Sequence, residues 1–234
     1  MISHFKDRKY SLKNIGGQID TYISNVVCLI HFDGSNASTT ITDSKNNHTI
    51  TAVGNAQLST SSPKFGSACA SFDGTGDYLS LDGSADFAMA TSDFTVEFWY
   101  RPVSVAAGLN GLCFFSGSGV TIGIYRSAAT VSVTRDQTPN TSISGTGAPL
   151  TANTWAHIAL ARSGTQTKLF VNGNQCGATY TDTLNYLTSA NYPRLGFMPT
   201  IGQINGQMDE FRVTKGIARY TANFTPPTLE FPNS

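Results

Sequence analysis

The sequence predicts an all-β fold, a sandwich of two antiparallel sheets preceded by an extended N-terminal arm. Short segments that alternate apolar and polar residues recur with turn residues between them, and no segment of ordinary helical length carries an apolar stripe. The clearest segment is 93–102, where Phe94, Val96, Phe98 and Tyr100 share one face of an extended chain. Such an aromatic face needs a second apolar surface to cover it, so we expect an inner strand of the sandwich here.

Length and composition fit one large β domain. The chain has 234 residues, of which 40% are hydrophobic and only 13% charged. Lys plus Arg and Asp plus Glu are both 15, so the net charge is zero, and nothing steers the whole protein towards nucleic acid or an anionic membrane. The longest apolar run, 26–30, is too short for membrane insertion, and 1–14 lacks the apolar core of a secretion signal. We therefore expect the four cysteines to be buried free thiols.

The first third of the chain predicts an arm and then a run of short strands. Residues 1–22 have little apolar periodicity and are predicted to form the arm, either frayed or docked on a partner. Residues 23–234 are predicted to form a single domain. Its first strands are expected over 26–32, 49–53, 56–58, 68–72 and 78–81. The glycines of 73–77 predict a tight reversal, a hairpin or a corner.

After the central segment, further strands are expected over 111–115, 120–125, 130–135, 155–162, 167–171 and 207–214. Asn172-Gly173 follows an apolar run and predicts a type I′ hairpin. Residues 140–153 are predicted to be a loop, and 215–220 could form a single helical turn. The prolines in 220–232 predict an extended tail that lies along the sandwich without pairing centrally.

Several motifs, in order along the chain, resemble the laminin-G-like, concanavalin A-like jelly roll. They are Phe72-Asp73-Gly74, Gly76-Asp77-Tyr78-Leu79, Asp93-Phe94-Thr95-Val96-Glu97-Phe98-Trp99, Trp155-Ala156-His157-Ile158-Ala159-Leu160-Ala161-Arg162, Lys168-Leu169-Phe170-Val171-Asn172-Gly173 and Gly206-Gln207-Met208-Asp209-Glu210-Phe211-Arg212. The resemblance runs over 26–232 and implies that fold. Because the fold hosts lectins, glycosidases and adhesion modules alike, it does not by itself fix the function.

The closing segment, Val213 to Tyr220 with Phe224-Thr225-Pro226-Pro227, is similar to the ending of such domains in tailed-bacteriophage structural proteins. That resemblance implies a virion protein, made in the host cytoplasm. We predict a non-enzymatic capsid decoration protein held to other virion proteins, of capsid or tail, by 1–22 and assembled as a homo-oligomer, a trimer. The alternative is a carbohydrate-binding adhesion module, attached to tail or capsid, that recognises host-surface glycans.

Catalytic constellations are missing from the sequence. A retaining glycosidase needs two carboxyl groups about 5–5.5 Å apart, yet Glu97 stands alone on its strand and adjacent Asp209 and Glu210 are expected on opposite faces. His157 lies within a predicted strand and is interpreted as a hydrogen-bonded structural histidine. These features predict that the protein is not an enzyme.

A structural Ca²⁺ is a candidate cofactor. Asp209 shares strand parity with Phe211 and is therefore expected to point inward, where a carboxylate must be paired, ligated or protonated. Related jelly rolls hold Ca²⁺ where the first and last strands meet, which would bring Asp33 towards Asp209 as its metal ligands. The alternative is that Asp209 accepts backbone N–H bonds or pairs with an arginine, Arg212 or Arg101.

Four aromatic residues outside the predicted core are candidates for contacting a glycan, because stacking and amide hydrogen bonds hold sugars in such folds. They lie in or near loops with Asn and Thr, and are Tyr125, Tyr180, Tyr186 and Tyr192. Each one can equally serve local packing. The region 180–192 is the first place to look.

Overall fold

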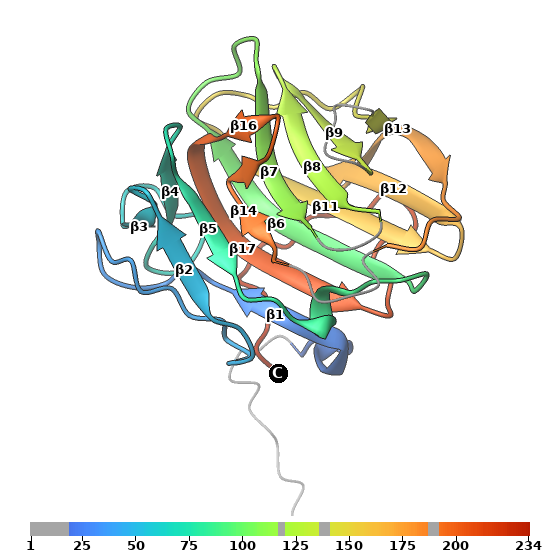
Figure 1. Cartoon of the computed structure of the whole chain (residues 1–234), viewed down its shortest axis with the longest axis horizontal. Coiled ribbons are helices and arrows are strands. Elements are labelled where there is room, and N and C mark those ends of the chain that lie inside the picture. Colours follow the sequence, from blue (N-terminus) through green and yellow to red (C-terminus); the bar gives the residue numbers. More distant parts are fainter. Residues whose placement is uncertain (1–18, 117–119, 136–140, 187–191) are drawn as a thin grey trace, which may run out of the picture.

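A computed structural model describes residues 19–116, 120–135, 141–186 and 192–234. Two antiparallel sheets stack face to face, as predicted (Figure 1). One has eight strands, in the order β13-β12-β11-β6-β17-β4-β3 with β1 paired to β17, and the other has seven, in the order β10-β9-β8-β7-β14-β5-β2. A two-stranded hairpin, β15-β16, completes the set. The fold is the predicted jelly-roll sandwich.

All strands of the described residues belong to these three sheets. The eight-stranded sheet contains β1 (Val26–Ile30), β3 (Gln57–Ser59), β4 (Cys69–Asp73), β6 (Phe94–Pro102), β11 (Ala156–Ser163), β12 (Gln166–Val171), β13 (Asn174–Thr181) and β17 (Asn205–Lys215). The seven-stranded sheet contains β2 (Ile50–Val53), β5 (Tyr78–Leu81), β7 (Leu109–Phe115), β8 (Ile122–Ser127), β9 (Thr130–Thr134), β10 (Thr141–Ser144) and β14 (Arg194–Leu195). The hairpin is β15 (Phe197–Met198) and β16 (Gly202–Gln203).

Helical structure within the described ranges is limited to two short 3₁₀ turns, η1 (Ile23–Asn25) and η2 (Ala85–Phe87). Residues 215–220 do not form the helical turn that the sequence allowed. A membrane-spanning helix is likewise not found in the part of the chain that the structure describes.

Strand β6 is the inner strand that its sequence predicts. It lies between β11 and β17, and its alternate residues Phe94, Val96, Phe98 and Tyr100 all enter the main core between the sheets. Two sheets packed in this way share one apolar interior, to which each strand contributes every second residue. The other face of β6 points away from that core, and it too is buried.

Two predicted turns are confirmed. The chain passes from β4 in one sheet to β5 in the other, so the segment 73–77 forms a corner. Asn172 and Gly173 have φ values of 50° and 77°, and Val171 pairs with Asn174 across them. Positive φ at both central residues is the requirement of a type I′ turn.

The C-terminal tail, residues 216–234, contains no strand and packs on the outer face of the eight-stranded sheet. Gly173 permits this close contact, since a Cβ there would lie 1.9 Å from the Phe224 carbonyl oxygen. Phe224 and Tyr220 pack against Ala159, Ala161 and Phe170 of the sheet. The extended tail predicted from its prolines is confirmed, and it explains why both faces of β6 are buried.

The hairpin β15-β16 covers the middle of the outer face of the seven-stranded sheet (Figure 1). Met198 of the hairpin packs directly on two glycines of the sheet. A Cβ on Gly111 would lie 2.3 Å from the Met198 Cβ, and one on Gly123 would lie 2.9 Å from the Met198 Sδ. Ile201 adds a contact in the same small apolar cluster. Glycine at both strand positions is what allows the hairpin to approach the sheet.

Some elements were not predicted. Strand β10 lies inside the segment 140–153 that was predicted to be a loop, and the two-residue strands β14, β15 and β16 have no counterpart among the expected strands. The four cysteines are buried free thiols, as predicted. Of the predicted arm, residues 1–18 lie outside the described residues.

Candidate functional site

A buried ionic network occupies the outer face of the eight-stranded sheet, with Glu97 of β6 at its centre. Oε1 of Glu97 accepts hydrogen bonds from Nε and Nη2 of Arg212, at 3.0 and 2.8 Å. Oε2 accepts one from the Tyr220 hydroxyl at 2.8 Å and lies 3.2 Å from Nε2 of His157. Burial acts to raise the pKa of the Glu97 carboxyl. The charge of Arg212, together with the hydrogen bond and charge of His157, outweighs burial and holds that pKa far below its ordinary value.

The network continues into the segment before β1. Asp20 accepts two hydrogen bonds from Arg219, at 2.7 and 3.0 Å, and one from Arg212 at 3.1 Å. Asp20 is only 7% exposed, so a residue within the predicted arm lies against the domain. Two buried carboxylates and two guanidinium groups thus compensate one another, which is the condition for burying such charges.

The tail closes this surface, which we call the tail-covered face: the outer face of the eight-stranded sheet beneath residues 216–234. The rings of Tyr220 and Phe224 stack 3.6 Å apart, and the Phe231 ring lies 3.9 Å from the Arg212 guanidinium carbon. His157 is 0% exposed and presents its ring to Tyr220, Phe224 and Phe231. A substrate would have to displace the tail to reach Glu97 or His157, so this cluster is structural.

A second buried pair fastens the end of the tail. Nδ1 of His31 lies 2.7 Å from Oε1 of Glu210, and Oε2 of Glu210 accepts the backbone N–H of Phe231 at 2.7 Å. Nε2 of His31 contacts the Asn233 side-chain oxygen at 3.0 Å. Burial acts to lower the pKa of His31, yet Glu210 outweighs it and raises the pKa to about 9. His31 therefore carries a positive charge at neutral pH.

The expected inward orientation of Asp209 is wrong. A β-bulge separates the pair Asp209–Trp99 from the pair Arg212–Glu97, and Glu210 at the bulge has φ of 50°. One extra residue reverses the alternation along a strand, so Asp209 lies on the tail-covered face whereas Phe211 enters the core. Adjacent Asp209 and Glu210 both bond to segments that cover this face, and they are not on opposite faces as expected.

The two predicted metal ligands bond to one loop. Oδ2 of Asp209 accepts the backbone N–H groups of Lys64 and Phe65, at 2.7 and 3.2 Å. Asp33 accepts the backbone N–H and the hydroxyl of Ser67. Burial raises the pKa of Asp209 to about 8. The two hydrogen bonds from Lys64 and Phe65 match the alternative in which Asp209 accepts backbone N–H groups.

Within the described ranges no group of three or more His, Cys, Asp or Glu side chains could hold a metal ion. The carboxylates of Asp33 and Asp209 would therefore need backbone oxygens to complete a Ca²⁺ shell. The structural Ca²⁺ stays a prediction.

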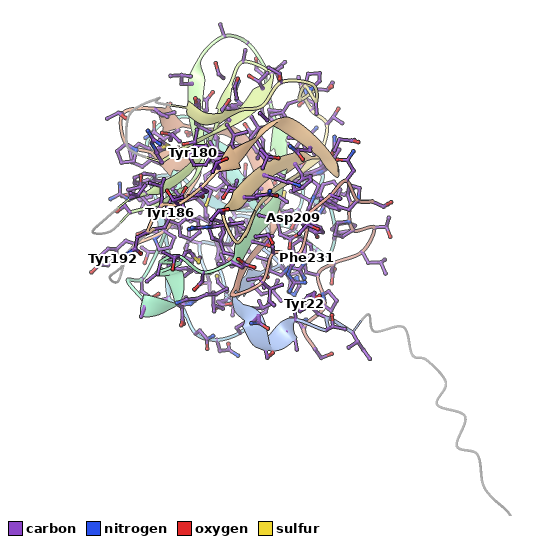
Figure 2. The ribbon with its side chains drawn as sticks, turned by 90° about the vertical axis from the view of Figure 1, so that its right-hand side faces the viewer. Tyr22, Tyr180, Tyr186, Tyr192, Asp209 and Phe231 are labelled. Atoms are coloured by element: carbon purple, nitrogen blue, oxygen red, sulfur yellow. The ribbon has the colours of Figure 1, made fainter. Side chains whose placement is uncertain are left out.

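The four tyrosines predicted to contact a glycan do not form one surface. Tyr125 is 4% exposed beneath the hairpin, and Tyr186 is 5% exposed, with its hydroxyl donating to Asp182 at 3.0 Å. Tyr180 accepts a hydrogen bond from Arg135 at 2.7 Å and, with Tyr186, lines an internal cavity of about 10 Å³. Figure 2 shows Tyr180, Tyr186 and Tyr192 spread along one side of the domain.

Only Tyr192, at 60%, is well exposed among the four. Tyr125 and Tyr186 are buried and serve packing, so the expectation for them is wrong. Tyr180 is partly buried, and for Tyr180 and Tyr192 glycan contact stays a prediction. The part of the prediction on 187–191 lies outside the described residues.

A partly exposed aromatic and cationic group lies on the outer face of the seven-stranded sheet, which we call the hairpin face. Its members are Tyr78 of β5, Arg194 of β14 and Phe197 of β15, and we call these three residues the platform. The ring centroids of Tyr78 and Phe197 are 5.4 Å apart, and the Arg194 guanidinium carbon lies 5.5 Å from each. These distances fit cation–π contacts with both rings.

Sequence alternation explains why the platform points outward. In β5 Leu79 and Leu81 enter the core, so Tyr78 lies on the outer face. Arg194 pairs with Ser80 of the same strand, and the next residue, Leu195, is again in the core. Residue 78 is far from residues 194 and 197 in the sequence. The three come together only because β5 and β14 are neighbours in the sheet, so sequence spacing could not predict the platform.

Solved structures with the same fold are similar over most of the chain. Domain 4 of AbnA, an extracellular arabinanase from Geobacillus stearothermophilus solved with arabinotriose, has a TM-score of 0.63 and 17% identity, covering 83% of this chain and 94% of that domain. The binding domain of Paraclostridial Mosquitocidal Protein 1 has a TM-score of 0.64 and 15% identity, covering 84% of this chain and 50% of that one.

A structure of botulinum neurotoxin type C, whose cell entry depends on two ganglioside molecules, has a TM-score of 0.64 and 12% identity, covering 84% of this chain and 49% of that one. The chain thus spans about half the length of these toxin chains. The low identities show a shared fold and no more.

Comparison with curated protein sequences gave no significant match. A family model gave one: residues 73–218, well over half of the chain, match the model of the Concanavalin A-like lectin/glucanases superfamily. That stretch contains β6, β11, β12 and the corner before β5, which are the elements that build the sandwich. The chain belongs to the Concanavalin A-like lectin/glucanases superfamily.

Proposed function

We propose that this protein is a non-catalytic carbohydrate-binding module. The observation that carries the proposal is the platform, in which two aromatic rings and a guanidinium group lie partly exposed on the hairpin face. Sugars present C–H groups on one face and hydroxyl groups at the rim, so they suit aromatic surface beside hydrogen-bond donors. The names of similar structures support it, since one was solved with arabinotriose and another concerns interaction with gangliosides.

The positions of the acidic residues favour binding over hydrolysis. A glycosidase needs two carboxyl groups that reach the same glycosidic bond. Glu97 is 0% exposed and fully bonded beneath the tail, while Asp209 and Glu210 accept backbone N–H groups. None of these three carboxyl groups is free to approach a sugar from solvent.

A glycan array probed with the full chain tests the proposal, followed by calorimetric titration of the best glycan. We expect specific binding that weakens at least tenfold in the double variant Tyr78→Ala/Phe197→Ala. The matched control is Tyr192→Ala, which removes a more exposed ring outside the platform. Failure of the array and of insoluble polysaccharides to retain the protein would overturn the function. Loss of binding in Tyr192→Ala alone would overturn the platform as its site.

We also propose the setting in which the module works: a virion surface, where it decorates the capsid or adheres to host glycans. The support is the similarity of residues 213–227 to the endings of such domains in phage structural proteins. Asp20 belongs to the buried network, so a clean test deletes only residues 1–18. Stripped particles should rebind the full chain and fail to rebind the deleted one; equal rebinding would reject the anchoring arm.

A further inference from the structure

We propose that the platform selects sugars that carry a carboxylate, with Arg194 taking the carboxylate and the flanking rings taking the sugar's C–H face. The inference rests on the proposed function and narrows it to one ligand class. The shared chemistry is a pyranose ring with a carboxylate substituent. A uronic acid and a sialic acid both satisfy it, and paired acidic and neutral sugars distinguish them.

Arg194 differs from the other described arginines because none of the residues that the structure describes accepts a hydrogen bond from it. Backbone carbonyl groups accept from Arg126 and Arg162, side-chain oxygens accept from Arg101 and Arg135, and carboxylates accept from Arg212 and Arg219. The contacts of the Arg194 guanidinium in the described structure are with two ring faces. Its five N–H donors are therefore available to a ligand.

The two rings hold the guanidinium in place without using those donors. Cation–π contacts act through the ring faces, whereas N–H donation is directed along the plane of the guanidinium. A planar fork that is already positioned loses less conformational entropy when it binds. A carboxylate is the group whose two oxygens match that fork, and such paired, charge-assisted hydrogen bonds are the strong ones.

Polar residues flank the platform, and no carboxylate of the described residues bonds to Arg194 in competition with a ligand. Arg194 pairs with Ser80 on one side, and Phe197 pairs with Gln203 in the hairpin. Neither the Ser80 hydroxyl nor the Gln203 side-chain amide has a hydrogen-bond partner in the described structure, so both can serve sugar hydroxyls. The formal net charge of the chain is zero, so any preference for acidic sugars has to come from a local group such as Arg194.

Two other open grooves, both lined by described residues, offer no unpaired cation among those residues. One, of about 280 Å³, lies beside the tail and is lined by Arg212 and Arg219, both already paired with carboxylates. The other, of about 290 Å³, is lined by Asp43 and His48. The Asp43 carboxylate accepts three backbone N–H groups, and both His48 ring nitrogens have partners. The platform is thus the better acceptor of an anionic sugar.

The test compares matched acidic and neutral sugars on the full chain by calorimetry: sialyllactose against lactose, and a galacturonic acid trimer against the neutral galactose trimer. We expect one acidic sugar to bind at least tenfold more tightly than its neutral partner, and which pair shows this identifies the source of the carboxylate. The preference should shrink at 0.5 M NaCl, because screening weakens ion pairs at a partly exposed site.

Three variants complete the test. Arg194→Gln should abolish the tenfold preference, Arg194→Lys should keep part of it because the charge remains without the fork, and Lys45→Gln, which removes one positive charge elsewhere, should keep it whole. Equal binding of acidic and neutral sugars by the wild type, or an unchanged preference in Arg194→Gln, would overturn the inference while leaving carbohydrate binding intact. Failure to bind any glycan would overturn both.

Discussion

Both outer faces of the sandwich carry an arginine packed against aromatic rings, but the two arginines differ in their other contacts. On the tail-covered face, Arg212 is 4% exposed and shared between two carboxylates under the Phe231 ring. On the hairpin face, Arg194 is partly exposed and lies against two rings, and no carboxylate of the described residues forms an ion pair with it. What covers a strand therefore decides whether an outward arginine stabilises the fold or is available to a ligand.

The largest effect should come from Arg212→Gln. It leaves Glu97 and Asp20 buried with one guanidinium fewer, and breaking a buried ion pair costs about 3–5 kcal/mol. Denaturant unfolding measures the loss in free energy of unfolding. A loss below about 1 kcal/mol would mean that the network contributes little and that the two faces differ less than their contacts indicate.

Phe231→Ala should come next. Phe231 is 2% exposed and packs on Val26 and Leu29, so its truncation should cost about 3 kcal/mol and loosen the tail. Trypsin should then cleave after Arg219 much faster than in the wild type. The control is Leu229→Ala in the same tail, which is 54% exposed and should change neither stability nor cleavage. Equal cleavage of both variants would contradict the role given to Phe231.

Alkaline pH should weaken the tail-covered face through His31. Its pKa is about 9 when folded and 6.5 by ordinary value, so its contribution is complete below pH 6.5 and is lost as pH rises through 9. We expect the free energy of unfolding to fall by on the order of 2 kcal/mol more in the wild type than in His31→Gln between pH 6 and 9.5.

Comparison with the variant is needed because the raised pKa of Asp209, about 8, also makes stability fall with rising pH. Parallel pH profiles for wild type and His31→Gln would refute the contribution of His31.

The smallest effect on stability should be that of Arg194→Gln. Exposed cation–π contacts contribute about 0.5–1 kcal/mol each, so the loss should stay near 1 kcal/mol while the preference for acidic sugars disappears. The same unfolding measurement used for Arg212→Gln provides the comparison. A loss as large as that of Arg212→Gln would make Arg194 a structural residue too.

The architecture was within reach of sequence reasoning because alternation is a local signal. The pattern from Phe94 to Tyr100 predicted the inner strand and its core face, and Asn172-Gly173 predicted the hairpin that follows β12. The bulge at Glu210 was not predictable in the same way, because a residue other than glycine takes a positive φ there. That one residue reversed the predicted side of Asp209.

The platform could not be predicted from the sequence. Strands β14 and β15 have two residues each, too few to show any period, and the platform joins residues more than a hundred positions apart. Of the four tyrosines chosen from loop composition, Tyr125 and Tyr186 are buried and only Tyr192 is well exposed, since composition does not say whether a ring is covered. Alternation along β6 likewise does not say what covers its outward residues, which the tail buries in the structure.

One backbone hydrogen bond has a practical consequence. The N–H of Asp20 donates to the carbonyl oxygen of Ser234 at 2.9 Å, so the two ends of the described domain meet at one edge. A tether, a dye or a solid support joined at either end hangs from that edge, by the tail-covered face, and the hairpin face belongs to the opposite layer. An attachment at this edge therefore lies beside the tail-covered face and leaves the hairpin face, with its platform, uncovered.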